Sequence, residues 1–113
     1  MAVFVDDMRA RLGRRIMCHM IADSESELHA MAHHIGIARR SYQGDHYDIG
    51  RSQRAIAVRA GAREGTQRQL AAMLWLAHNG QTMGQPETAI ERMIAARAIL
   101  RGAARGRRPV TSR

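Results

Sequence analysis

A helix-start signature at Ser24 and Glu27 limits the folds open to this chain more than any other feature. In an S-x-x-E capping box, each side chain satisfies a backbone N–H that the first helical turn leaves free. Apolar residues then follow at the spacing i, i+3, i+4 and i+7, which forms one stripe along a helix: Leu28, Met31, Ala32 and Ile35. Gly36 suits a left-handed cap. We therefore expect a helix over residues 24–35.

A second capping box stands at Thr66 and Gln69 and predicts a helix that Asn79-Gly80 ends. Its apolar residues cover a wide part of its surface: Leu70, Met73, Leu74, Trp75, Leu76 and Ala77. A helix of this kind packs against two neighbouring elements, or against a partner subunit. The Trp75 helix is therefore also a candidate homodimer interface, or a surface that covers a host protein.

Short apolar and β-branched runs alternate with these helices. We expect strands over residues 2–5 and 16–22, with a basic loop over 8–15 between them. Further along the chain we expect a short strand over 37–43, a turn at 44–45, a helix over 50–60, and a connector or short strand over 62–65. Pro86 suits the first position of a long helix.

The order of elements predicts an α+β fold, a small sheet layered by helices, with a C-terminal helical extension. We divide the chain into a core domain over residues 1–80, a helix packed on it over 81–102, and a basic disordered tail over 103–113. The tail is rich in Arg and has no apolar periodicity. A chain of 113 residues is long enough for one such domain.

The charge of the chain favours a polyanionic partner. The formal net charge is +8, and all 18 basic residues are Arg. Guanidinium groups stay ionised and can bind phosphate with two hydrogen bonds, so nucleic acid or a nucleotide is the expected ligand. A GC-rich genome would also explain the absence of Lys.

The expected location is the cytoplasm of a bacterial cell. The single cysteine, Cys18, cannot form an internal disulfide, which fits a reducing compartment. The apolar run at 2–5 is too short for a signal peptide, and the chain has no apolar stretch long enough to span a membrane. We therefore expect no membrane partner.

Carboxylates and imidazoles occur where predicted strands end: Asp6, Asp7, His19, Asp23, His46 and Asp48. Such groups bind Mn²⁺, Mg²⁺ or Zn²⁺, and these ions stabilise phosphoryl transfer. His46 and Asp48 are two apart, so in an extended segment they face one way. Alternatively, Asp23 and Asp48 cap helices, while Asp6 and Asp7 pair with Arg in the loop over 8–15. A divalent metal is thus a possible cofactor, with no cofactor as the alternative.

A second candidate site is a phosphate-binding patch at the predicted helix over 50–60. Arg51 and Arg54 are three apart and share a face of that helix. Arg39 could add to the patch, with His46 and Asp48 beside it. The alternative is a solvated helix face. Cys18 has no catalytic partner in the sequence, and we expect it to be a small buried residue.

Five ordered blocks of the sequence resemble a known family: 3–7 (VFVDD), 18–23 (CHMIAD), 27–32 (ELHAMA), 46–49 (HYDI) and 54–62 (RAIAVRAGA). Over about Val3 to Leu70 the chain is similar to the bacterial and phage proteins of domain-of-unknown-function family 4031. Cys18 stands where the family often has Ser, and Gln53 where it often has Lys. The resemblance implies a compact domain of bacterial or phage origin. It implies no catalytic residues.

We therefore expect a phage-type accessory or regulatory protein, not an enzyme, that binds a phosphate-bearing ligand through Arg39, Arg51, Arg54, His46 and Asp48. One alternative is a metal-dependent phosphoesterase or nuclease that uses the Asp and His residues. The other is an inhibitor that binds a host protein through a helical surface.

Overall fold

The computed structural model describes residues 2–106. Five strands and four α-helices follow one another, with one turn of 3-10 helix (η1) among them. Their bounds are β1 Val3–Val5, β2 Ala10–Leu12, β3 Arg15–Ala22, α1 Glu25–His34, η1 Arg39–Ser41, β4 Tyr47–Gly50, α2 Arg51–Arg59, β5 Arg63–Glu64, α3 Gln67–His78 and α4 Pro86–Gly106. The fold is α+β, as the order of elements predicted.

Strand β3 is the centre of the sheet. Its last residues pair antiparallel with β1 and its first residues pair antiparallel with β2. β4 pairs with the middle of β3, and β5 adds to β1 in parallel. Met17 and Met20 each have a partner in β4 as well as in β2 or β1. β4 therefore lies along the opposite edge of β3 from β1 and β2.

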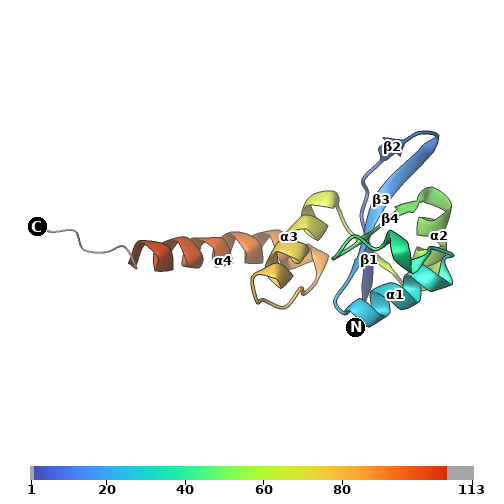
Figure 1. The fold of residues 1–113 in the computed structure, drawn as a ribbon. Helices are drawn as coiled ribbons and strands as arrows, with labels where there is room; N and C mark the ends of the chain where they lie inside the picture. Colours follow the sequence, from blue (N-terminus) through green and yellow to red (C-terminus); the bar gives the residue numbers. More distant parts are fainter. Residues whose placement is uncertain (1, 107–113) are drawn as a thin grey trace, which may run out of the picture.

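The sheet separates two hydrophobic cores, because successive side chains of a strand point to opposite faces. On one face, Cys18, Met20 and Tyr47 pack with Leu28 of α1 and Ala57 of α2. The other face carries Phe4 and Ile21, which pack against α3 and the start of α4. The members of this second core from the two helices are Leu70, Ala72, Met73, Leu76 and Ala89. Figure 1 shows α1 and α2 on one side of the strands, and α3 and α4 on the other.

Helix α3 buries its apolar surface between the sheet and α4, so neighbours within the chain explain most of it. α4 begins at Pro86, as predicted, but continues to Gly106, beyond the expected end at 102. Its second half extends away from the body (Figure 1) and exposes Ile99 and Leu100. Residues 107–113, most of the expected tail, lie outside the described residues.

Four details differ from the sequence-based expectations. The expected basic loop over 8–15 contains β2, which forms a hairpin with β3. Residues 39–41 form η1 and not a strand, because no neighbouring strand pairs with them. β4 spans Tyr47–Gly50, a stretch after the expected turn at 44–45 to which no strand had been assigned. The capping box at Ser24 is half formed, since Ser24 accepts from the Glu27 N–H while Glu27 Oε2 is buried without a partner.

Among the described residues, no helix is long and apolar enough to cross a membrane.

Candidate metal centre

Three neighbouring segments place a row of polar side chains on the α3 face of the sheet. Asp6 directly follows β1, and its N–H donates to the carbonyl of His19 in β3 at 3.1 Å. On the other edge of β3, His19 is paired with Asp48 of β4. The register thus places His19 between two carboxylates.

The buried carboxylate of Asp6 fixes His19 from one side. Asp6 is fully buried and is the only buried charged residue in the described part of the chain. Its Oδ1 accepts from the backbone N–H groups of Met8 and His19, and its Oδ2 lies 2.7 Å from Nδ1 of His19. Since a carboxylate accepts, Nδ1 is the donor in this pair, and Nε2 is the ring nitrogen that remains to face Asp48. That Nε2 lies 3.9 Å from Oδ1 of Asp48.

His46 repeats this arrangement from the other side of Asp48. Its Nδ1 lies 2.6 Å from Oδ1 of Asp45, and its Nε2 lies 3.5 Å from Oδ1 of Asp48. The other oxygen of Asp45 lies 3.1 Å from Nε2 of His78, at the end of α3. The rings of His19 and His46 meet edge to face, with centroids 5.2 Å apart. Both imidazoles therefore turn Nε2 toward the same carboxylate oxygen.

His19, His46 and Asp48 fit the requirements of a divalent transition metal ion. Their three nearest ligand atoms all lie within 4.8 Å of one another. Metal–ligand bonds of about 2.0–2.1 Å at tetrahedral angles place ligand atoms about 3.3 Å apart, so small side-chain movements would complete the set. Each ligand also has an outer partner, because Asp48 Oδ2 accepts from Gln43 Nε2 at 2.7 Å. Outer partners of this kind orient metal ligands in known sites.

The other two carboxylates of the expected metal set lie outside this cluster. Asp7 Oδ1 accepts from the backbone N–H of Gln67, at the start of α3. Asp23 Oδ1 accepts from the backbone N–H of Ala2. Asp7 is exposed, whereas Asp6 is buried. Of the six residues expected, the structure brings together Asp6, His19, His46 and Asp48.

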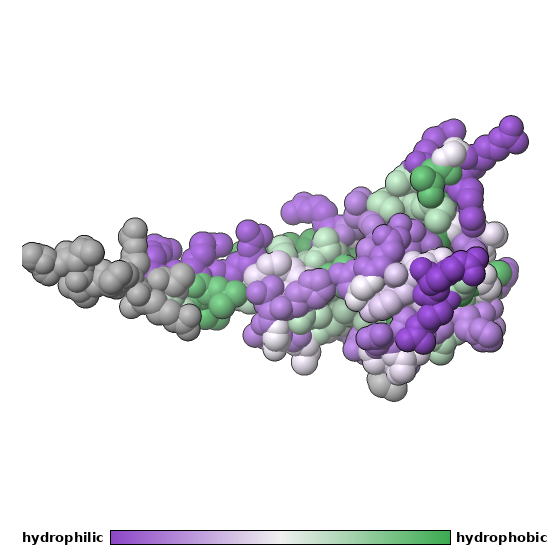
Figure 2. All heavy atoms as spheres, viewed as in Figure 1, coloured by the Kyte–Doolittle hydropathy of each residue, from purple (hydrophilic) through white to green (hydrophobic). Residues whose placement is uncertain are grey.

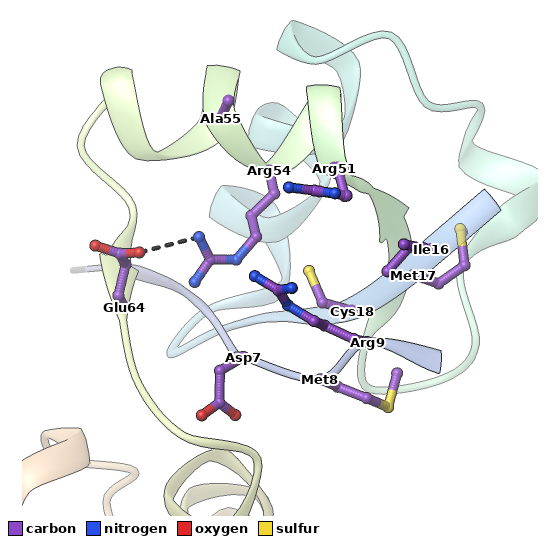
Figure 3. A pocket seen from close by; sticks show the side chains of 10 residues that line it. All are labelled: Asp7, Met8, Arg9, Ile16, Met17, Cys18, Arg51, Arg54, Ala55 and Glu64. Carbon is purple, nitrogen blue, oxygen red and sulfur yellow. Dashed lines mark hydrogen bonds and ion pairs between the residues drawn. The ribbon is translucent and has the colours of Figure 1, made fainter. Parts of the chain in front are cut away.

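The arginines expected to bind phosphate lie at two separate places. Arg51 and Arg54 line a cleft of about 390 Å³ on the α2 face of the sheet, together with Arg9 and Cys18 (Figure 3). Arg39 lies in η1 and lines a different pocket with His29 and Tyr47. His46 and Asp48 belong to the opposite face, because Tyr47 and Ile49 point into the first core. The expected five-residue ligand site is therefore not assembled as one pocket.

Sequence reasoning missed Asp45, His78 and Arg9. Asp45 stands beside His46, and this adjacency is the signal that could have identified it. His78 is distant in sequence and comes close only through the packing of α3. Arg9 was assigned to a loop, and its place in the cleft depends on the β2–β3 hairpin.

Cys18 lies at the base of the cleft beside Arg54 and is buried, as expected. Burial, with a smaller contribution from the negative charge of Asp6, raises the pKa of its thiol from 9.0 to about 11. The thiol is therefore protonated at neutral pH. A protonated thiol is a poor nucleophile.

Fold and site together define a small α+β domain with a histidine–carboxylate cluster on one face of its sheet. The chain belongs to the family described as Protein of unknown function (DUF4031), whose model matches residues 3–77. The match includes Asp6, His19, Asp45, His46 and Asp48 but not His78, and it ends before α4. No curated protein and no solved structure matches the chain.

Proposed function

We propose that this protein binds one divalent transition metal ion through His19, His46 and Asp48, and that it hydrolyses phosphoesters at that ion. One observation carries the proposal: two imidazoles, each with Nδ1 held by a carboxylate, turn Nε2 toward the same oxygen of Asp48. Imidazole with carboxylate suits Zn²⁺ or Mn²⁺ better than Mg²⁺ or Ca²⁺.

The number of ligands supports a catalytic site over a purely structural one. Structural zinc sites have four protein ligands, whereas catalytic sites have three and keep a position for water or substrate. A cavity of about 260 Å³ adjoins both imidazoles, and Leu70 and Leu74 of α3 lie on its apolar side. The bound ion would lower the pKa of a bound water and polarise a phosphoryl oxygen. The net charge of +8 favours an anionic substrate.

Metal content and melting temperature test the binding step. The purified protein, stripped with chelator and dialysed against Zn²⁺ or Mn²⁺, should retain one equivalent and melt at a higher temperature. His46→Ala and Asp48→Ala should each abolish the retention. His33→Ala is the matched control, because His33 is exposed on α1 outside the cluster. Equal metal binding by all four proteins would disprove the assignment.

Turnover of bis-p-nitrophenyl phosphate tests the hydrolytic step. The metal-loaded protein should release p-nitrophenol, and Asp48→Ala should reduce the rate to background while His33→Ala retains it. If the ion binds stoichiometrically but no turnover occurs with this ester or with oligonucleotides, the centre is a binding site without phosphoesterase activity.

A further inference from the structure

The cleft on the α2 face has more basic than acidic side chains, and within the described residues only Arg54 of its three arginines has an ion-pair partner, Glu64. Arg9, Arg51 and Arg54 line it, with Asp7 and Glu64 at its rim. In Figure 3 the three guanidinium groups surround one space beside Cys18, while the Asp7 carboxylate points away from it. The cleft thus gathers three cations around a space large enough for a phosphate group.

Arg9 and Arg51 are available to bind a ligand, whereas Arg54 is held in place by other residues of the protein. Arg54 donates from Nε to the backbone carbonyl of Asp6 and from Nη1 to Glu64 Oε1, both at 2.9 Å. The side chains of Arg9 and Arg51 make no hydrogen bond or ion pair with any residue over 2–106. Their charges are therefore free to meet an anion, next to a guanidinium that is already held in place.

The β2–β3 hairpin extends this positive charge beyond the cleft. Arg11, Arg14 and Arg15 follow Arg9 along it and are exposed, and residues 8–22 contain no acidic side chain. In Figure 1 the hairpin projects from the body of the molecule, and Figure 2 shows its end dominated by hydrophilic residues. A row of arginines on a projecting hairpin suits a ligand that has several phosphates in succession, and one phosphate group would leave most of them unpaired.

The chemistry of Cys18 indicates binding at this cleft and no covalent step. A thiol that is protonated at neutral pH cannot attack phosphorus efficiently. Burial holds the pKa of this thiol at about 11. The three guanidinium groups of the cleft suit phosphate oxygens as hydrogen-bond acceptors, because guanidinium stays protonated and exchanges no proton with them.

From this arrangement we infer that the Arg9–Arg51–Arg54 cleft and the β2–β3 hairpin bind the phosphate backbone of a nucleic acid. One phosphate occupies the cleft, and its neighbours along the strand meet Arg11, Arg14 and Arg15. The inference does not depend on the proposed metal centre, which lies on the opposite face of the sheet.

Fluorescence anisotropy with a labelled 12-nucleotide single strand and the matching duplex tests this surface, with chelator present so that the metal centre plays no part. The double variant Arg9→Ala/Arg51→Ala removes the two unpaired cations. The control Arg39→Ala/Arg40→Ala removes the same charge from η1, away from the cleft. Melting curves of both variants verify that they fold.

The cleft variant should bind the single strand at least tenfold more weakly than the intact protein, and the control less than threefold. The slope of log K against log salt should fall by about 1.4 for the cleft variant, since each phosphate contact to a single strand contributes about 0.7. Three results would overturn the inference: no binding by the intact protein at low salt, equal losses in both double variants, or competition by a mononucleotide as effective as by the oligonucleotide.

Discussion

Near Asp6, the two faces of the sheet differ in whether their charged and polar side chains have partners within the protein. On the α3 face, His19, His46 and Asp48 all have partners that fix their orientation, so polar groups are held close together. On the α2 face, Arg9 and Arg51 have none within the described residues. Adjacent residues of β3 take part in the two arrangements, because His19 faces one side and Cys18 the other.

This contrast is the basis for proposing a different ligand for each face. A metal ion requires donor atoms fixed within a few tenths of an ångström, and the hydrogen bonds around His19 and His46 supply that order before any ion arrives. A flexible polyanion requires positive charge that can adjust to it, and unpaired arginines supply that. Asp6 connects the faces, since its carboxylate holds His19 while its carbonyl accepts from Arg54.

The largest effect should appear on removing the buried carboxylate of Asp6, with the neighbouring Asp7 as comparison. Asp6→Ala leaves two backbone N–H groups and His19 without their buried acceptor, and should cost roughly 3 kcal/mol of unfolding free energy. Asp7→Ala removes one exposed acceptor at the start of α3 and should cost about 0.5–1 kcal/mol. Urea denaturation in chelator measures both. Equal losses would mean that Asp6 has no special structural role.

The second prediction concerns the reactivity of Cys18, which lies on the α2 face. With its pKa raised from 9.0 to about 11, the Cys18 thiol should react with iodoacetamide about 100-fold more slowly at pH 8 than an unperturbed thiol. Its rate should rise about tenfold per pH unit and level off only above about pH 11, whereas the rate of an unperturbed thiol levels off near pH 9. The pH dependence of alkylation, followed by mass spectrometry on the folded protein, measures this. A midpoint near 9 would show that the thiol is not buried beside Asp6.

A smaller effect separates the arginines of the cleft. Arg54→Ala removes the hydrogen bond to the carbonyl of Asp6 and should cost about 1 kcal/mol. The exposed ion pair with Glu64 adds little. Arg51→Ala, in which no hydrogen bond or ion pair within the described residues is lost, should stay within about 0.5 kcal/mol of the intact protein. Thermal melts compare the two, and a larger loss for Arg51→Ala would contradict its unpaired state.

Local signals in the sequence predicted most of the helical structure. The box at Thr66 and Gln69 forms with both hydrogen bonds, and α3 begins where it predicts. Pro86 begins α4, and the family resemblance is confirmed by the match over 3–77. Each of the two helix starts depends on residues close together in the sequence, so both could be predicted without the structure.

Pairing between distant segments was harder to predict. β2 and β4 are short, and each exists because β3 supplies its hydrogen-bond partners. Without β4, the sequence offered Asp48 as a helix cap and no reason to place it opposite His19. The cap of α2 is instead Gly50, whose N–H donates to Gln53. The sequence therefore contained the residue types of the proposed metal centre, but it did not reveal the strand register that brings His19 beside Asp48 and leaves Asp7 and Asp23 outside the cluster.

Histidine side-chain NMR during a Zn²⁺ titration tests the metal centre most directly. Long-range ¹H–¹⁵N spectra distinguish the two ring nitrogens of each of the six histidines. We predict that Nε2 of His19 and of His46 shift together and saturate at one equivalent, while their Nδ1 atoms stay protonated and His29, His33 and His34 keep their positions. Shifts spread over all the histidines, or none at His19 and His46, would contradict the assignment.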